Sequence, residues 1–220
     1  MSVRLGKRQR GKSAKEEIFA AALSIFNVKG FAGTSVRDIA KKAEVNVSTI
    51  SYYFEGKQGL LKHAFIEFFE PYIKILEDGL LYFNPDEADK GFKQTIEKIM
   101  DYQYNNFELS RFVWREVSID SQIVRELMST YFMKERYILT TMLEAGVKSK
   151  RFKKIPPGIA IIQLKAIISM PFLYSIYTSE VWNIHYQERF YFKKYKEQMM
   201  EWIDAVFVNR TGVAVNKEMI

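Results

Sequence analysis

The chain has 220 residues, 48% of them hydrophobic, which is enough to bury one large core or a small domain beside a larger one. It contains no cysteine, so disulfides and thiolate metal sites are excluded. The formal charge of +7 lies entirely on residues 1–62, which hold twelve basic and five acidic residues, whereas residues 63–220 hold twenty-one of each. A basic segment of this kind favours a nucleic-acid partner.

The N-terminus has no apolar run of the signal-peptide type, and no stretch approaches the roughly 20 apolar residues that span a bilayer. The longest apolar stretch, residues 159–177, is interrupted by Gln163 and Lys165. We therefore expect a cytoplasmic, nucleoid-associated protein without a membrane contact.

Residues 1–12 (MSVRLGKRQRGK) predict a basic, flexible arm before the first helix. Ser13 opens that helix with a capping box, since Glu16 stands three residues later. Apolar residues continue at helical spacing to Phe26. Gly30 then ends the helix as a residue that adopts positive φ without strain.

Residues 34–57 (TSVRDIAKKAEVNVSTISYYFEGK) have the length and pattern of two short helices joined by a tight turn. Ile39 and Ala40 face inward on the first helix, and Ala40 is small enough for another helix to cross there. Asn46 begins the second helix, which buries Ile50. This spacing is typical of a helix-turn-helix, whose second helix enters the DNA major groove. Charge alone would also fit a basic tail beside an ordinary helical pair.

Gly56 separates this motif from a fourth helix, which begins near Lys57 and runs into the mid-70s. Pro71 predicts a kink or an early end in that helix, and Met170-Pro171 predicts a kink in a later one. Helical periodicity continues over residues 90–108, 110–117, 121–147, 157–178 and 186–208.

No strand-like alternation is present, so we expect an all-α fold with two domains. The predicted parts are a basic arm (1–12), a helical domain that holds the helix-turn-helix (13–56), a larger helical domain (57–208) and a loose tail (209–220).

At this point the residues resemble the TetR family of transcriptional regulators. The pattern covers about residues 15–65: Ile18-x-x-Ala21-Ala22-x-x-x-Phe26, Lys29-Gly30-Phe31, Thr34-Ser35-Val36-Arg37-Asp38-Ile39-Ala40, Ala43-Glu44-Val45-Asn46-Val47-Ser48-Thr49-Ile50, Tyr52-Tyr53-Phe54 and Lys57. Glu44 departs from it, because members often carry glycine there, and positive φ at a glutamate costs on the order of 1 kcal/mol. Ser51 also replaces a commonly aromatic position.

The resemblance implies that residues 13–56 are a three-helix DNA-binding domain and residues 57–208 a dimerisation and effector domain. It also implies a homodimer that binds a palindromic site, commonly as a repressor. The last two long helices would form the dimer seam, and the alternative is that their apolar residues fill the subunit's own core. The candidate seam residues are Ile161, Ile162, Leu164, Ile168, Phe172, Trp202, Ile203 and Val206.

Two stretches also resemble a narrower group, the RefZ regulators of spore-forming Firmicutes. They are ISYYFEGKQGLL (50–61) and RFVWREVSIDSQIVRELMSTYFMKE (111–135). This resemblance implies binding to marked chromosomal sites during sporulation and inhibition of the cell-division protein FtsZ.

The predicted DNA contacts are Thr34, Ser35, Arg37, Asn46, Val47, Ser48, Thr49, Ser51, Tyr52, Tyr53 and Lys57. Tyr53 and Lys57 suit phosphate contacts, so their replacement by alanine should weaken binding to every sequence. Val47 and Thr49 suit base contacts, and their replacement should change the preferred sequence. Plain exposure of Val47 and a core position for Tyr53 are the alternatives.

Arg8, Arg10 and Lys12 of the arm offer either minor-groove contacts or non-specific attraction to DNA.

An enzyme finds little support, since His63 and His185 are far apart in sequence and no catalytic or metal-binding motif is present. We expect no cofactor and no metal. Aromatic residues could line a pocket for a small apolar effector, or could simply fill the core. The candidates are Tyr102, Phe107, Trp114, Phe132, Tyr137 and Tyr174.

Charged residues of one segment are candidates for a protein contact, with a solvated helix face as the alternative. They are Arg111, Arg115, Glu116 and Glu126.

Overall fold

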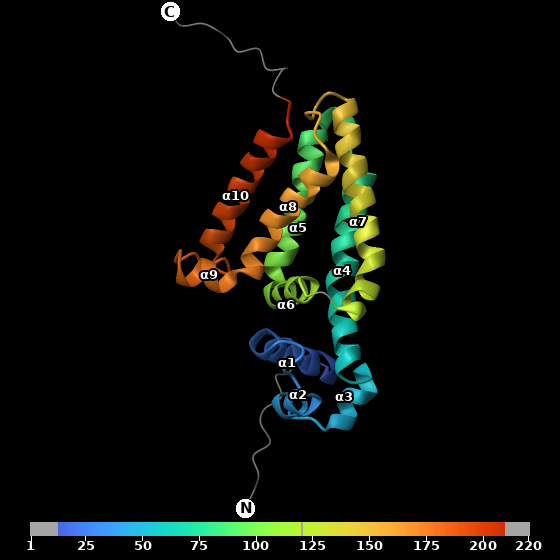
Figure 1. The fold of residues 1–220 in the computed structure, drawn as a ribbon, viewed down its shortest axis with the longest axis vertical. Coiled ribbons are helices and arrows are strands. Elements are labelled where there is room, and N and C mark those ends of the chain that lie inside the picture. Colours follow the sequence, from blue (N-terminus) through green and yellow to red (C-terminus); the bar gives the residue numbers. More distant parts are fainter. Residues whose placement is uncertain (1–12, 120, 210–220) are drawn as a thin grey trace, which may run out of the picture. The chain divides into compact units, whose positions relative to one another are not determined.

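The computed structural model describes residues 13–119 and 121–209, and these residues confirm the predicted all-α fold. Ten α-helices and one short 3-10 helix follow one another in this part of the chain (Figure 1). The predicted basic arm, with Arg8, Arg10 and Lys12, lies outside the described residues, as do residues 210–220 of the predicted tail.

The chain divides into two compact units, Met1–Ile66 and Glu67–Ile220. The division falls inside α4, a helix that runs over Lys57–Leu81, whereas the sequence placed the domain boundary between residues 56 and 57. The first turns of α4 therefore belong to the same unit as the helix-turn-helix.

The first unit contains α1 (Ala14–Lys29), α2 (Val36–Lys42) and α3 (Val47–Phe54) before α4 begins. The predicted capping box at Ser13 is confirmed, since the Ser13 backbone N–H donates to Glu16 Oε2 at 2.7 Å. Gly30 ends α1 with φ of 75°, as predicted. The core of this unit is apolar and consists mainly of Ile18, Ala22, Phe26, Ile39, Ile50, Phe54, Leu60, Leu61 and Phe65.

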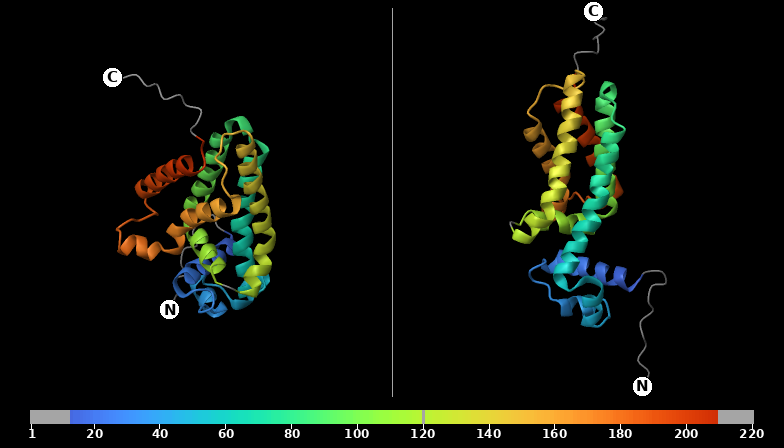
Figure 2. Two further views of the ribbon diagram at one scale, coloured as in Figure 1. Left: turned by 45° about the horizontal axis from the view of Figure 1, so that its top comes forward. Right: turned by 90° about the vertical axis from the view of Figure 1, so that its right-hand side faces the viewer.

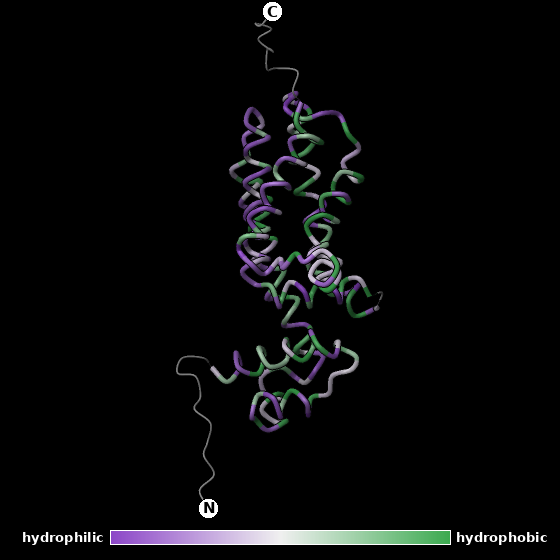
Figure 3. Tube along the Cα trace, turned by 90° about the vertical axis from the view of Figure 1, so that its left-hand side faces the viewer, coloured by the Kyte–Doolittle hydropathy of each residue, from purple (hydrophilic) through white to green (hydrophobic). Residues whose placement is uncertain are grey.

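The second unit contains the rest of α4 and seven further elements. These are η1 (Pro85–Glu87), α5 (Ala88–Asn105), α6 (Phe107–Val117), α7 (Gln122–Lys148), α8 (Pro157–Leu173), α9 (Ser175–Glu180) and α10 (Arg189–Val206). Within this unit α4 and α7 run side by side (Figure 2), and their contacts include the Tyr131 hydroxyl, which donates to Glu70 Oε1 at 2.9 Å, and an ion pair between Lys134 and Glu77 at 3.5 Å. Most helices mix hydrophilic and hydrophobic residues along their length (Figure 3), as helices with one buried face must.

Pro71 lies inside α4, yet the helix continues to Leu81 instead of ending in the mid-70s. A proline has no N–H, so it leaves the carbonyl four residues earlier without its helical donor. Here that carbonyl belongs to Glu67, and the Tyr102 hydroxyl donates to it at 3.0 Å and to the carbonyl of Phe68 at 2.9 Å. The tyrosine of α5 therefore satisfies the backbone that the proline leaves open.

Pro171 in α8 has the same kind of partner. The carbonyl four residues earlier belongs to Ile167, and the Tyr195 hydroxyl of α10 donates to it at 2.6 Å. The predicted helix over residues 157–178 is wrong in one respect, because α8 ends at Leu173 and a separate helix, α9, begins at Ser175.

Half of the candidate seam residues fill the subunit's own core. Leu164, Ile168 and Phe172 of α8 and Ile203 of α10 are each at most 3% exposed. They point inward because α8 packs on α6 and α7, while α10 packs on α5. Ile162, in contrast, is 67% exposed.

Candidate nucleic-acid interface

Helices α2 and α3 form the predicted helix-turn-helix. Ile39 and Ala40 of α2 are buried, as is Ile50 of α3. At the corner between the helices, Glu44 has φ of 54° and the Val45 N–H donates to the carbonyl of Ala40 at 3.0 Å. The positive φ expected if Glu44 replaces a glycine is therefore present.

The outer face of α3 carries the side chains predicted to read DNA. Val47 is 42% exposed and Tyr52 is 81% exposed, while Tyr53 is 40% exposed and so only partly packed inward. The tyrosine rings meet edge to face, with centroids 5.0 Å apart. Ser48 and Ser51 are also exposed, whereas Thr49 is half-buried.

The N-terminal end of α3 is free to meet a phosphate. Asn46 is exposed at the N-cap position, and its side chain makes no capping hydrogen bond to the helix. Backbone N–H groups at a helix start have no partner within the helix and attract anions. The Asn46 side chain and the first turn of α3 therefore offer donors to DNA.

The three predicted contacts at the start of α2 have different surroundings. Thr34 is buried, at 2% exposed, and its hydroxyl donates to the carbonyl of Gly30 at 2.7 Å. Ser35 caps α2, and its hydroxyl and backbone N–H both donate to Asp38, which lowers the pKa of that carboxyl. Of the three, only Arg37 has an exposed side chain that forms no hydrogen bond or ion pair with another described residue. The structure thus gives Thr34 and Ser35 local structural roles.

Lys57 also bonds within its own unit. Its ammonium donates to the carbonyls of Phe31 at 3.0 Å and Thr34 at 2.9 Å, and it lies 4.5 Å from the centroid of the Phe31 ring. These contacts tie the first turn of α4 to the loop between α1 and α2. An ammonium has three hydrogens, so at most one is left for a phosphate.

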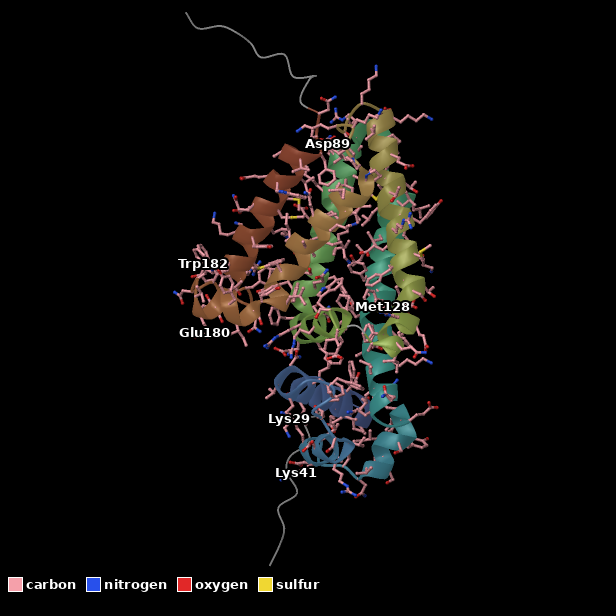
Figure 4. The ribbon with its side chains drawn as sticks, in the orientation of Figure 1. Lys29, Lys41, Asp89, Met128, Glu180 and Trp182 are labelled. Carbon is pink, nitrogen blue, oxygen red and sulfur yellow. The ribbon has the colours of Figure 1, made fainter. Side chains whose placement is uncertain are left out.

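Two lysines that the sequence did not single out, Lys41 and Lys42, are exposed in the last turn of α2, and Figure 4 labels the first of them. In the sequence, two adjacent lysines directly before the predicted turn are the feature that could have indicated these DNA contacts. Exposed lysines beside a reading helix strengthen attraction to the phosphate backbone.

The candidate effector-pocket residues do not share one cavity. Phe107 lines one hollow of the second unit, and Phe132 lines a different one. Tyr137 and Tyr174 are exposed, at 67% and 59%. The hydroxyl of Tyr102 is used by the backbone of α4.

Trp114 packs against a lysine side chain, not against an open pocket. The Lys165 ammonium lies 4.2 Å from the centroid of Trp114 and 5.6 Å from that of Phe132. It pairs with Glu135 at 2.7 Å, and the Tyr72 hydroxyl donates to the same carboxylate. Burial and the neighbouring carboxylate raise the pKa of Tyr72 well above its ordinary value.

The four candidates for a protein contact do not form one exposed surface. Glu116 is buried at 8%, and Arg111 and Arg115 are half-buried. Glu126 is exposed and accepts a hydrogen bond from Gln122, one turn away on α7. Glu126 therefore fits the alternative interpretation, a solvated helix face with side-chain pairs one turn apart.

Among the described residues, no group of three or more histidine, cysteine or acidic side chains is arranged to hold a metal ion. In the same part of the chain, no helix combines the length and the apolar character needed to cross a membrane.

Comparison with known proteins bears on this interface. Residues 18–64 match the family described as bacterial regulatory proteins, tetR family. Over 200 residues the chain is 45% identical to the "Probable HTH-type transcriptional regulator YttP" of Bacillus subtilis (strain 168), a match that covers 91% of this chain and 96% of YttP. The HTH-type transcriptional regulator RutR of Escherichia coli (strain K12) is 33% identical over 108 residues, 48% of this chain and 46% of RutR.

A solved structure has the same fold. It is a regulatory protein in the tetR family from Rhodococcus RHA1, with a TM-score of 0.65 and 19% sequence identity. The alignment covers 87% of this chain and 97% of that one.

Proposed function

Since the chain belongs to the TetR family of bacterial regulatory proteins, we propose that it is a repressor that binds a palindromic DNA site as a homodimer. The family membership makes the chain a DNA-binding transcriptional regulator of the helix-turn-helix type and not an enzyme. Repression, dimerisation and the palindrome are the parts that we add.

The observation that carries the proposal is the outer face of α3. Val47, Ser48, Ser51 and Tyr52 are exposed on it, next to the uncapped start of the helix at Asn46. A methyl-bearing side chain and small hydroxyls suit base edges in the major groove, while the helix start and the neighbouring Tyr53 suit phosphates.

The dimer is supported by α8. Its only charged residue, Lys165, is paired with Glu135, and yet Ile159 and Ile162 are 58% and 67% exposed. A helix that is apolar on all sides is normally buried on all sides. A second copy that covers this face would also place two reading helices for the half-sites of a palindrome.

The test is to incubate the purified chain with sheared genomic DNA of its source and to sequence the fragments that it retains. We expect palindromic sites in one or a few promoters. No enrichment over the input at moderate salt would overturn the proposal.

Affinity for a recovered site then tests the interface. Tyr53→Ala should weaken binding on every sequence, whereas Tyr82→Ala should not, because Tyr82 is equally aromatic, 81% exposed and part of the second unit. Equal affinities of Tyr53→Ala and the unmodified chain would argue against docking through α3.

A second candidate function is a RefZ-like regulator that marks chromosomal sites and inhibits FtsZ. The resemblance of residues 50–61 and 111–135 favours it. Recovered palindromes scattered at particular positions outside promoters, together with slower FtsZ assembly in light scattering, would support this candidate over a local repressor. The small apolar effector stays a prediction in either case.

A further inference from the structure

A hollow of about 200 Å³ lies in the second unit between α6, α9 and the loop before α10. Its apolar walls are Phe107, Pro171, Ile184 and Tyr186. Phe107 and Tyr186 both pack against Phe172, with ring centroids 5.3 and 5.5 Å away. Packing of this kind holds the walls in place. The volume lies below the roughly 300–1,000 Å³ of sites for drug-sized ligands, so it suits a small molecule.

Arg111 gives this hollow its charge. It lies one helical turn after Phe107, so both side chains emerge from the same face of α6. The Arg111 Nε is buried and has no hydrogen-bond partner among the described residues. No aspartate or glutamate is among the described residues that line the hollow. Partial burial of a guanidinium without a carboxylate partner costs free energy unless a bound anion accepts its hydrogen bonds.

The polar groups around Arg111 determine which hydrogen bonds a ligand can form in the hollow. Ser175, Thr178 and Ser179 lie on one face of α9 and line the hollow. Thr178 and Ser179 donate their hydroxyl hydrogens to backbone carbonyls of α9, at 2.9 and 3.1 Å. The polar groups left for a ligand are therefore the guanidinium of Arg111, the Ser175 hydroxyl, the Gln187 side-chain amide and the ring of His185. The His185 Nε2 lies 3.2 Å from Asn183 Oδ1.

We infer that this hollow is a binding site for a small organic monocarboxylate with an apolar body. The carboxylate accepts two N–H groups of Arg111, and the body lies against Phe107, Ile184 and Tyr186. The site shares Phe107 with the expected apolar effector pocket and differs from it in its charged side chain, Arg111. It also does not rest on the proposed function, since the ligand needs no DNA to bind.

Glu108, Glu180 and Glu188 each directly follow a lining residue in the sequence, and Figure 4 labels Glu180 near Trp182. All three glutamates are exposed and none is among the lining residues, so among the described residues the hollow itself holds no acidic side chain.

Calorimetric titration with benzoate tests the inference. Benzoate should bind, while benzamide, which lacks the charge, and inorganic phosphate, which lacks the apolar body, should bind far more weakly. Arg111→Gln should weaken benzoate binding by about 10- to 100-fold, the usual effect of losing a charged hydrogen bond. Arg111→Lys should fall between, because it keeps the charge and loses the fork.

Arg136→Gln is the matched control. It removes the same charge from an exposed position on α7, so benzoate affinity should not change. The inference would be overturned if benzoate does not bind, or if benzamide or phosphate binds as tightly as benzoate. It would also be overturned if Arg111→Gln binds benzoate with unchanged affinity.

A second variant serves if Arg111→Gln fails to fold. Ser175→Glu supplies a carboxylate from within the chain at the rim of the hollow. It should abolish benzoate binding and raise the melting temperature. Benzoate affinity equal to that of the unmodified chain would count against the site.

Discussion

Glu44 and Glu55 lie before and after the reading helix α3, and both have left-handed backbone, with φ of 54° and 58°. A side chain with a β-carbon is strained in that region by about 1–2 kcal/mol. The surrounding contacts therefore hold this corner of the helix-turn-helix against a local preference.

Glu44→Gly should stabilise the chain, because glycine adopts this backbone without strain. The gain should be at most about 1 kcal/mol, since glycine also loses more backbone freedom on folding. Urea unfolding measures it. Glu44→Gln is the control: it removes the charge but keeps the β-carbon, so it should bring no gain. Equal stabilisation by both changes would point to charge instead of strain.

Lys57→Met should lower the free energy of unfolding by about 1.5–3 kcal/mol, because the carbonyls of Phe31 and Thr34 lose a charged donor. Binding to every DNA sequence should weaken with it. The dependence of binding on salt should hardly change, since the ammonium acts within its own unit. In Lys41→Met, by contrast, the loss of an exposed charge should reduce the salt slope by about 1. A similar reduction of the salt slope in Lys57→Met would instead support the predicted contact between Lys57 and a phosphate.

Single residues were predictable where their partners are close in sequence. The Ser13 cap needs only Glu16, and the bend after α1 needs only Gly30. The internal role of Lys57 was out of reach, because its two acceptors precede it by 26 and 23 residues. A lysine beside a reading helix suggests a phosphate contact unless the fold is known.

At the level of whole helices, two prolines are kept inside α4 and α8 by tyrosines of other helices. Tyr102→Phe should cost about 0.5–1.5 kcal/mol, because the carbonyls of Glu67 and Phe68 lose the hydroxyl that donates to them. The same change made together with Pro71→Ala should cost less, since alanine restores the helical N–H. A double-mutant cycle of unfolding free energies measures the coupling. Strictly additive effects would show that the hydroxyl and the proline are independent.

The helices themselves followed from periodicity, but their ends at prolines did not. Pro71 and Pro171 are visible in the sequence as possible breaks. Whether a helix continues depends on a donor from elsewhere, and nothing near residue 71 indicates Tyr102. Both prolines have such a donor, yet α4 runs on to Leu81 whereas α8 stops at Leu173, soon after its proline.

For the molecule as a whole, the exposed apolar face of α8 is the proposed dimer seam. Ile162→Glu should convert a dimer into monomers, because it places a charge in the proposed seam. Binding to a full palindrome should fall sharply with it. Met133→Glu is the control, since Met133 is 63% exposed on α7. Sedimentation velocity measures both variants. A dimer that persists in Ile162→Glu would place the contact elsewhere.

The fold class and the family pattern could be predicted from the sequence, because both depend on the spacing of residues that are close together in the chain. The interior of the second unit could not. Aromatic residues suit a core and a pocket equally well, and only the structure shows Trp114 stacked over Lys165 while Phe107 borders a hollow. The charge of that hollow depends on the absence of a partner for Arg111, which sequence spacing does not reveal.

The two proline–tyrosine pairs also bear on how this chain can diverge. Positions 71 and 102, and positions 171 and 195, are joined through a backbone carbonyl that belongs to neither residue. A lineage that loses one of these prolines no longer needs the matching hydroxyl, whereas a lineage that loses the tyrosine first removes the donor to that carbonyl until the proline is replaced. Related chains should therefore exchange the members of each pair in a preferred order, proline before tyrosine.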